Sequence, residues 1–268
     1  MNEFKIRASA ASQIVGGHIG LSPAQNKEHI KLTDKLASGK PLTDLQGKAL
    51  QDLTNKIANP EAPQGLKTYC ENWYKEQLYQ RRKEFSSKYT AKGNEVEDAS
   101  INYIAEQLGY GMLIKNEKHF TNDFLKGTPD VILKNHIIDV KNSWDWSTFP
   151  LLETKVEPAY YWQAQAYLDL VGRDSYKLIY VLSDTPADLI QKEAYYYARN
   201  NGFEELTDEI YQYFVEKMTY PDVDDSLKIR VFEIKRNEND IKKLYSRVKT
   251  CREYINDLPC YLAANALP

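Results

Sequence analysis

The chain has 268 residues and a mass of 31.0 kDa, enough for one sizeable domain with additions or for a domain and a small helical lobe. Its 42% hydrophobic and 27% charged residues are ordinary for a globular protein, and no apolar run is long enough to span a membrane. The net charge of −3 excludes a generally basic nucleic-acid-binding protein, so any DNA contact must come from a local patch. The first residues, Met1–Arg7, lack the features of a signal peptide, and we expect a cytoplasmic protein.

The number and spacing of the cysteines limit the kinds of cysteine site that the chain can form. Cys70 lies far from Cys251 and Cys260 in the sequence, and there is no Cys-x-x-Cys pair. Three dispersed cysteines do not supply the four ligands of an iron–sulfur cluster. We therefore expect no iron–sulfur cluster, and we expect reduced, structural thiols.

The first ninety residues carry patterns typical of helices. Ser9 or Ser12 is predicted to cap a short helix, whose free N–H groups, together with Arg7, form a candidate anion site. An ordinary helix cap beside a surface arginine explains the same residues equally well. A helical hairpin is predicted within residues 22–66, followed by a long helix from about Leu66 to Lys88.

The most cationic segment runs from Lys75 to Lys92 and includes Arg81 and Arg82, with Tyr79 and Tyr89 interleaved. A run of charges is usually a solvated face. The alternative is a track for a phosphate backbone, with the tyrosines available for stacking. The sequence leaves both interpretations open.

A helix is predicted between about residues 93 and 108. Helical spacing places one glutamate, Glu97, on its apolar face, with Ile101, Ile104 and Leu108. Glu95 falls on a different, more polar face. A glutamate on an apolar face is costly unless it is paired or bound to a metal, so this reasoning selects Glu97 as the functional one.

Two apolar runs, Val131–Leu133 and Ile137–Val140, flank a Lys134-Asn135 pair. This pattern predicts a β-hairpin with a two-residue turn. In that register Asp130 lies opposite Asp139, with their Cβ atoms about 4.5–5.5 Å apart. Carboxylates held so close repel each other unless a cation lies between them.

Lys141 follows Asp139 by two residues and projects from the same sheet face. Acids and a lysine at strand ends also occur at solvated hairpin tips. Here they are embedded in strongly apolar strands, which favours a functional site. Two acids with a neighbouring ammonium group indicate a site for a divalent cation.

Two tryptophans, Trp144 and Trp146, lie in a polar loop that ends at a proline. Beside a nucleic-acid site they are candidates for stacking on an unpaired or terminal base. The alternative is a lid that packs back on the helices.

The remaining elements complete an α/β pattern. A helix is predicted from Glu157-Pro158 to Leu170, with Gln163 and Tyr167 on the same side. Strands are predicted at Met112–Lys115, Lys177–Leu182 and Arg230–Ile234, a helical insertion at Thr185–Tyr220, and a last helix at about Asn239–Asn256.

Pro129-Asp130 followed by Asp139-Val140-Lys141 resembles the PD-(D/E)xK nuclease motif, and its surroundings resemble the RecB-like and phage lambda exonuclease-like branch. Lys92–Glu97 resembles the helix that donates a glutamate in this family. Gln163 and Tyr167 resemble the Gln-xxx-Tyr motif of the RecB-like members. Each motif alone is weak, but their order and spacing match over residues 90–170.

The resemblance implies a mixed α/β fold: a restriction-endonuclease-like core with a central mixed β-sheet flanked by helices, and helical N-terminal and C-terminal insertions. Residues 1–90 are then a helical part packed on the core, and residues 91–268 form the core, with a helical insertion at about 185–222.

The implied chemistry is hydrolysis of phosphodiester bonds with Mg²⁺ or Mn²⁺, giving a 5′-phosphate and a 3′-hydroxyl. The expected metal ligands are Asp130, Asp139, Glu97 and the Val140 carbonyl, and Lys141 orients or deprotonates the attacking water. Aspartate instead of the commoner glutamate at position 139 leaves one or two metals open. Candidate DNA contacts are Gln163, Tyr167, Arg7, Ser9, Arg81, Arg82, Trp144 and Trp146.

The function that follows is a metal-dependent DNA exonuclease of the phage recombination type, acting on duplex ends or single strands in the host cytoplasm. One alternative is a structure- or sequence-selective endonuclease on the same core. Another is a nucleic-acid-binding protein with a degenerate site. A single-strand annealing recombinase is the candidate partner, and a homo-oligomer is consistent with the toroidal trimers of lambda-type exonucleases.

Overall fold

The computed structural model describes residues 3–82 and 87–264. Contacts between residues divide the chain into two compact units. One unit comprises Met1–Ile6, Ala10–Arg82 and Asn239–Pro268, and the other comprises Arg7–Ser9 and Lys83–Glu238. The prediction divides the chain once, near residue 90, into a helical N-terminal part and a core. The C-terminal helix, however, groups with the N-terminal unit, because long-range packing need not follow sequence order.

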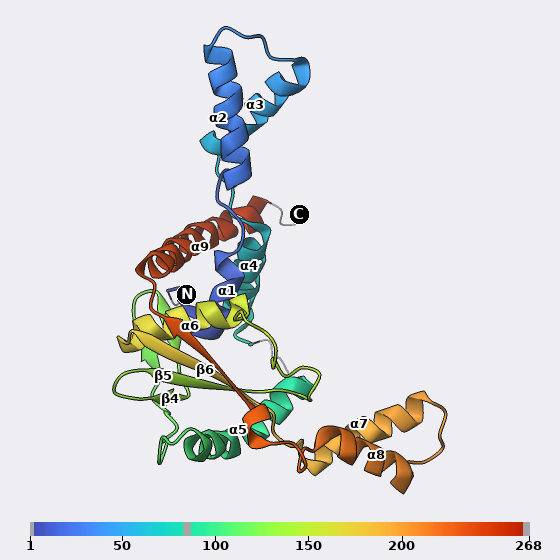
Figure 1. The fold of residues 1–268 in the computed structure, drawn as a ribbon. Helices are drawn as coiled ribbons and strands as arrows, with labels where there is room; N and C mark the ends of the chain where they lie inside the picture. The colour runs from blue at the N-terminus through green and yellow to red at the C-terminus, as the bar shows by residue number, and fades with distance from the viewer. Residues whose placement is uncertain (1–2, 83–86, 265–268) are drawn as a thin grey trace. The chain divides into compact units, whose positions relative to one another are not determined.

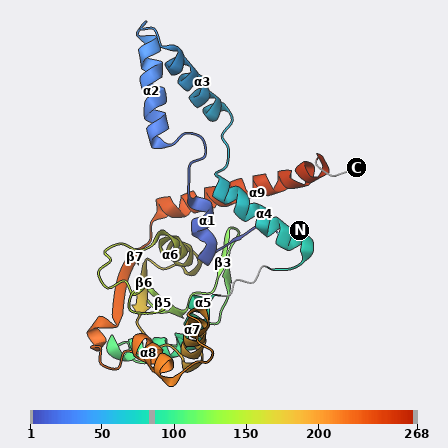
Figure 2. The ribbon, with the colours of Figure 1, turned by 90° about the vertical axis from the view of Figure 1, so that its right-hand side faces the viewer.

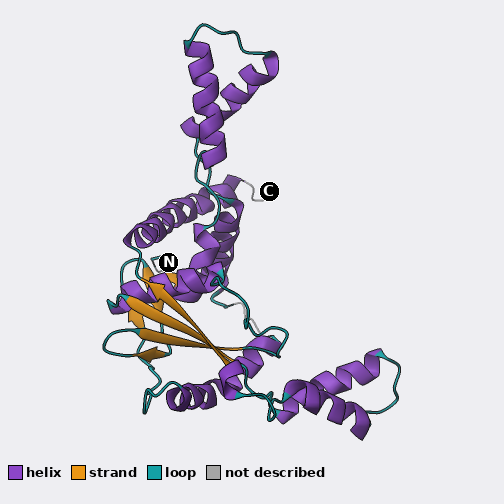
Figure 3. Cartoon of the chain, viewed as in Figure 1, coloured by secondary structure: helices purple, strands orange, loops and turns teal. Residues whose placement is uncertain are grey.

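The second unit is built on a four-stranded mixed sheet with the order β4-β5-β6-β7. Its strands are among those drawn in orange in Figure 3. β5 (Ile137–Asn142) pairs antiparallel with β4 (Val131–Ile132) and parallel with β6 (Ser175–Val181). β7 (Ile229–Lys235) is antiparallel to β6. α6 (Pro158–Val171) supplies the crossover that a parallel pair requires. The predicted mixed α/β class with a central sheet is confirmed.

The hairpin between β4 and β5 has the predicted register. Val131 pairs with Ile138 and Ile132 with Ile137, and the amide of Leu133 donates to the carbonyl of His136 at 2.9 Å across the turn. The alternation of apolar side chains therefore determined the pairing, since a slip by one residue would expose the buried face.

The two faces of β5 serve different purposes. Ile138 and Val140 belong to a buried cluster with Ile101 and Ile104 of α5 (Lys88–Gln107). The residues that alternate with them, Asp139 and Lys141, project to the opposite face because successive strand side chains alternate. One face thus forms the core, and the other presents polar groups.

Three predictions around α5 are wrong: the end of the preceding helix at Lys88, the start of α5 near residue 93, and the place of Leu108 on its apolar face. The helix expected to continue to Lys88 ends at Tyr79, where Gln80 adopts a left-handed conformation (φ 49°). α5 then begins at Lys88, because the Ser87 side chain caps it by accepting from the amide of Thr90. Leu108 is 39% exposed, since α5 ends one residue before it.

The strand predicted at Met112–Lys115 is also wrong, apart from a single bridge between Lys115 and Val131. Gly109 and Gly111 have φ values of 67° and 71°, which turn the chain before a strand can form. Met112 is 88% exposed and so contributes nothing to the core.

A small sheet with the order β1-β3-β2 joins a strand near the N-terminus to two strands that follow residue 115. It contains β1 (Ile6–Arg7), β2 (Phe120–Thr121) and β3 (Leu125–Gly127). Gly127 in β3 has no room for a side chain, because a Cβ atom there would lie 2.7 Å from the ring of Tyr167. The glycine therefore lets the chain pass closely over α6 just before Asp130.

The predicted helical insertion is confirmed as a hairpin of α7 (Ala187–Asn200) and α8 (Asp208–Met218), which extends away from the sheet (Figure 1). Its apolar faces meet in a cluster that includes Leu189, Ile190 and Phe214. A short 3₁₀ helix, Asp225–Leu227, leads into β7.

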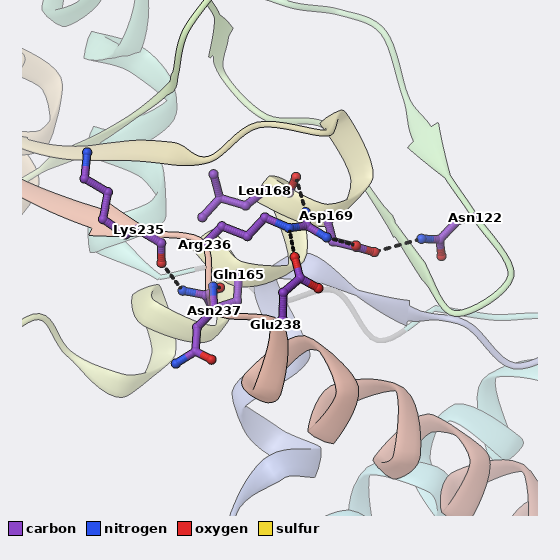
Figure 4. Close-up of polar contacts among 8 residues, drawn as sticks. All are labelled: Asn122, Gln165, Leu168, Asp169, Lys235, Arg236, Asn237 and Glu238. Carbon is purple, nitrogen blue, oxygen red and sulfur yellow. Dashed lines mark hydrogen bonds and ion pairs between the residues drawn. The ribbon is translucent and has the colours of Figure 1, made fainter.

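The end of β7 is fastened to α6 by the polar network in Figure 4. Gln165 donates to the carbonyl of Lys235 and accepts from the amide of Asn237, both at 2.8 Å. Arg236 donates to the carbonyl of Leu168 and pairs with Asp169 at 2.8 Å. These bonds hold α6 over the polar face of the sheet.

The first unit is helical (Figure 2). It contains the predicted hairpin of α2 (Pro23–Ala37) and α3 (Asp44–Ala58), together with α1 (Ala11–Val15), α4 (Gln64–Tyr79) and α9 (Glu238–Ala264). Capping boxes at Ser22 and Thr43 begin α2 and α3. No helix within the described residues is both long and apolar enough to cross a bilayer.

The predicted serine cap of the first helix is wrong. α1 begins after Ala10, which provides no side-chain hydrogen bond. Ser9 lies in the preceding 3₁₀ turn, Ala8–Ala10, so its hydroxyl is not placed at the helix start.

Candidate active site

Asp139 lies at the centre of the polar face of β5 and is fully buried. Its Oδ2 atom contacts the Nζ atom of Lys141, and its Oδ1 atom accepts a long hydrogen bond of 3.4 Å from Gln163 of α6. A buried carboxylate is costly unless it is paired, and these two partners provide the pairing.

Asp130 enters the site from the residue before β4. Its Oδ2 atom accepts a hydrogen bond of 2.9 Å from the amide of Val140. Burial raises the pKa of Asp130 to about 7, and the charge of Asp139 adds to this rise, while Lys141 and the Val140 amide oppose it. The two carboxylates therefore repel each other as expected, and the single lysine only partly compensates them.

Lys141 carries the opposite charge. Burial alone would lower its pKa, but the carboxylates of Asp139 and Asp130 outweigh this effect and raise it. The amine therefore remains an ammonium group across the physiological range. Its Nζ atom also lies 5.5 Å from the centre of the Tyr160 ring, within the range of a cation–π contact.

Glu97 reaches the site from α5. Its side chain is 25% exposed and forms an ion pair of 2.7 Å with Lys115. The hydrogen bonds to Glu97 and Asp98 raise the pKa of Lys115. Glu97 lines a cavity beside Asp130 and Lys141, whereas Glu95 is exposed elsewhere on the helix.

Asp130, Lys141 and Glu97 open into a cavity of about 470 Å³, whereas Asp139 lies buried behind its lining. Glu97, Asp130, Val140 and Lys141 form its polar side. Its other walls include the aromatic residues Tyr89, Trp144, Tyr160 and Tyr180. The size falls within the range of pockets for small organic ligands, about 300–1,000 Å³.

The donor set suits a hard divalent cation, because it consists of carboxylate oxygens whose mutual repulsion a cation would relieve. Burial is the main cause of the raised pKa of Asp130, and the neighbouring charge of Asp139 adds to it. Among the described residues, however, no three His, Cys, Asp or Glu side chains are already arranged as a ligand set. In this structure Lys141 forms an ion pair with Asp139, and Lys115 forms one with Glu97.

Gln163 and Tyr167, predicted to face the same way, are both buried and serve the site in different ways. Gln163 contacts Asp139, while the Tyr167 hydroxyl donates to the carbonyl of Thr128 at 3.0 Å. Burial raises the pKa of Tyr167 to about 12, so it remains a neutral donor. This bond holds the strand that leads to Asp130.

The two tryptophans have different environments. Trp144 is buried at 7% exposure and packs with Leu189 and Ile190 of α7, which matches the packing alternative. Its ring nevertheless lies at the cavity wall, with Lys88 4.7 Å from the ring centre. Trp146 is 63% exposed and does not line the cavity.

The lining of the cavity includes none of the other candidate DNA contacts. Arg7 and Ser9 belong to the second unit but do not line the cavity. Arg81 and Arg82 are exposed in the first unit, after α4. Residues 83–86 of the basic segment lie outside the described residues.

Lys92 corrects the prediction of a basic track. It was counted in the cationic segment, yet it is fully buried and donates to the carbonyls of Trp144 at 2.9 Å and Ser183 at 2.7 Å. Burial lowers its pKa to about 8, although Asp145 and Asp184 act to raise it. Its spacing of four from Val96, which is also buried, was the signal that could have revealed this.

Tyr160 is a cavity residue that the motifs did not single out. It lies three residues before Gln163 on α6 and therefore shares its face. Helical spacing from Gln163 and Tyr167 could have identified it.

The comparisons with known proteins identify the fold. No protein-family model matches the chain, and no curated protein matches its sequence. The structure of a phage related exonuclease from Haemophilus somnus 129PT is similar, with a TM-score of 0.70, 21% identity and coverage of 97% of both chains. An alkaline exonuclease, LHK-Exo from Laribacter hongkongensis, has a TM-score of 0.55 at 13% identity, covering 98% of this chain and 93% of that chain. LHK-Exo in complex with dAMP matches at the same TM-score and 14% identity. The chain therefore shares the fold of these exonucleases.

Proposed function

We propose that this protein is a metal-dependent DNA exonuclease that hydrolyses phosphodiester bonds from DNA ends. The observation that carries the proposal is the cluster of Asp130, Asp139 and Lys141 beside a cavity. A carboxylate pair with an ammonium group is the chemistry expected of a site that binds both a divalent cation and a phosphate. Similarity to the folds of two exonucleases supports action at DNA ends.

Asp130, Asp139, Glu97 and the Val140 carbonyl are the residues that would hold the cation. Bound Mg²⁺ or Mn²⁺ supplies a water of lowered pKa and neutralises charge that develops on the phosphate. Gln163 and the Val140 amide would orient Asp139 and Asp130, through the contacts that they make here.

Lys141, which contacts Asp139, would orient the attacking water or help to deprotonate it. It would also donate to a phosphate oxygen and stabilise the negative charge of the transition state. The product expected from the family resemblance is a 5′-phosphate and a 3′-hydroxyl.

The biological setting follows from the same resemblance. We propose a role in phage recombination or DNA processing in the host cytoplasm, with a single-strand annealing recombinase as the candidate partner. A homo-oligomer is also consistent with this resemblance.

Degradation of end-labelled linear duplex, compared with closed circular duplex, tests the proposal. We expect loss of the linear DNA alone with Mg²⁺ or Mn²⁺ and no loss with EDTA. Lys141→Ala should abolish it, while Lys134→Ala, at the exposed hairpin turn, should not. Cutting of the circle would instead indicate an endonuclease, and DNA binding without cleavage would indicate a degenerate site.

A further inference from the structure

The hairpin of α7 and α8 exposes an unusual number of large aromatic side chains. Five of them are between 44% and 58% exposed: Tyr195, Tyr196, Tyr197, Phe203 and Tyr213. Single exposed aromatic residues are ordinary, but a group on one helical hairpin is typical of a surface that meets a partner. Tyrosine in particular is enriched at protein interfaces.

These residues are not needed to hold the hairpin on its unit. That task falls to Leu189, Ile190 and Phe214, which are buried with Trp144. None of the five exposed aromatic residues lines the catalytic cavity. Their exposure therefore has no explanation in the core or in the proposed reaction.

The charge of the hairpin excludes a DNA backbone as its ligand. Residues 187–218 contain seven acidic and three basic residues, whereas the whole chain has a net charge of only −3. A negative surface repels phosphates and attracts cationic side chains.

Two of the tyrosines and several acids meet in one shallow hollow of about 530 Å³. Tyr195 and Tyr196 form one side, and Glu204 and Glu205 come from the loop that joins the two helices. Lys192 also lines the hollow, but its charge is compensated by Asp188 at 2.8 Å.

We propose that this hollow docks a segment of a partner protein that carries lysine or arginine side chains. Carboxylates would form charge-assisted hydrogen bonds with such a segment, and the tyrosine rings would accept its cations and cover its aliphatic stems. The surface lies on the unit that carries the cavity, so a docked partner would be brought to DNA that the enzyme is processing. Only this last consequence rests on the proposed function.

A peptide-binding experiment with the full chain tests the proposal without metal or DNA. The probe is a fluorescein-labelled twelve-residue peptide in which arginine and lysine alternate with leucine, and its control carries glutamate at the cationic positions. We expect fluorescence anisotropy to show binding of the cationic peptide only. The variants Tyr195→Ser with Tyr196→Ser, and Glu204→Gln with Glu205→Gln, should each weaken binding at least tenfold.

Matched controls separate the hollow from the general acidity of the hairpin. Tyr213→Ser removes an equally exposed tyrosine outside the hollow, and Asp208→Asn with Glu209→Gln removes the same charge outside it. Both should bind within twofold of the wild type. An equal loss in these controls, or no binding of the cationic peptide by a wild type that is folded by circular dichroism, would overturn the proposal.

Self-association is the competing use of the surface. If light scattering shows an oligomer that the hollow variants convert to monomers, a second copy of the chain occupies the hollow and the proposal is wrong. Nuclease activity should be unchanged in every variant, so failure of peptide binding remains distinct from failure of the proposed function.

Discussion

Two lysines of the same unit, Lys92 and Lys141, are both withdrawn from solvent but lie in opposite electrostatic environments. Lys92 is fully buried and donates to two backbone carbonyls, and its pKa is lowered to about 8. Lys141 contacts Asp139, and the charges of Asp139 and Asp130 raise its pKa. Neutral acceptors satisfy hydrogen bonds without compensating a charge, whereas carboxylates do both. We therefore propose that Lys92 supports the architecture and that Lys141 takes part in the chemistry.

The largest expected effect is on activity at Lys141. Lys141→Met should lower kcat by about 10²–10³-fold, because one charge-stabilising donor contributes roughly this much in enzyme sites. Steady-state rates on linear duplex, normalised to folded protein, measure it. Activity within threefold of the wild type would show that Lys141 does not act on the phosphate.

Lys92→Met should act on stability instead. It leaves the carbonyls of Trp144 and Ser183 without their buried donor, at a cost of about 2–4 kcal/mol in the free energy of unfolding. Urea denaturation measures the loss. Lys88→Met, four residues earlier on the same helix and exposed, is the matched control and should cost less than 1 kcal/mol.

The pH dependence of stability distinguishes the two lysines further. Between pH 8 and 10.5 the unfolded chain binds a proton at Lys92 that the folded chain has released. The unfolding free energy of the wild type should therefore rise relative to Lys92→Met as the pH increases through this window, by about 3 kcal/mol in total. Below pH 8 both states are protonated and the difference should be constant. A difference that stays flat up to pH 10.5 would mean that Lys92 keeps its ordinary pKa.

The smallest effect is expected at Ser100, which extends the polar contacts between α5 and the end of β5. Its hydroxyl donates to the Asn142 side chain at 2.6 Å. Ser100→Ala should cost about 1 kcal/mol in unfolding free energy and leave kcat within twofold. A large loss of kcat with unchanged stability would assign this bond to the reaction.

Local sequence patterns predicted several features around Lys141. The β4–β5 hairpin, its register and the convergence of Asp130 with Lys141 followed from alternating apolar residues over a short range. Helical spacing selected Glu97 over Glu95 for the same local reason, and the structure places Glu97 at the cavity. The predicted roles of these residues as metal ligands and DNA contacts remain predictions.

Charge counting was a poorer guide than periodicity. Lys92 belongs to a basic run in the sequence, but its fate depends on the carbonyls of Trp144 and Ser183, which come from segments 52 and 91 residues away. The prediction of a strand at Met112–Lys115 was wrong, because Gly109 and Gly111 turn the chain and the segment makes only one bridge, between Lys115 and Val131.

The sequence by itself determined the mixed α/β class, the order of the principal helices and strands, and which acids and which lysine converge, because these depend on the periodicity of neighbouring residues. Only the tertiary structure decided which charged groups are buried, what closes the cavity, and which helices belong together. Those features depend on contacts between distant segments, and a local pattern carries no information about the partner that a side chain will meet.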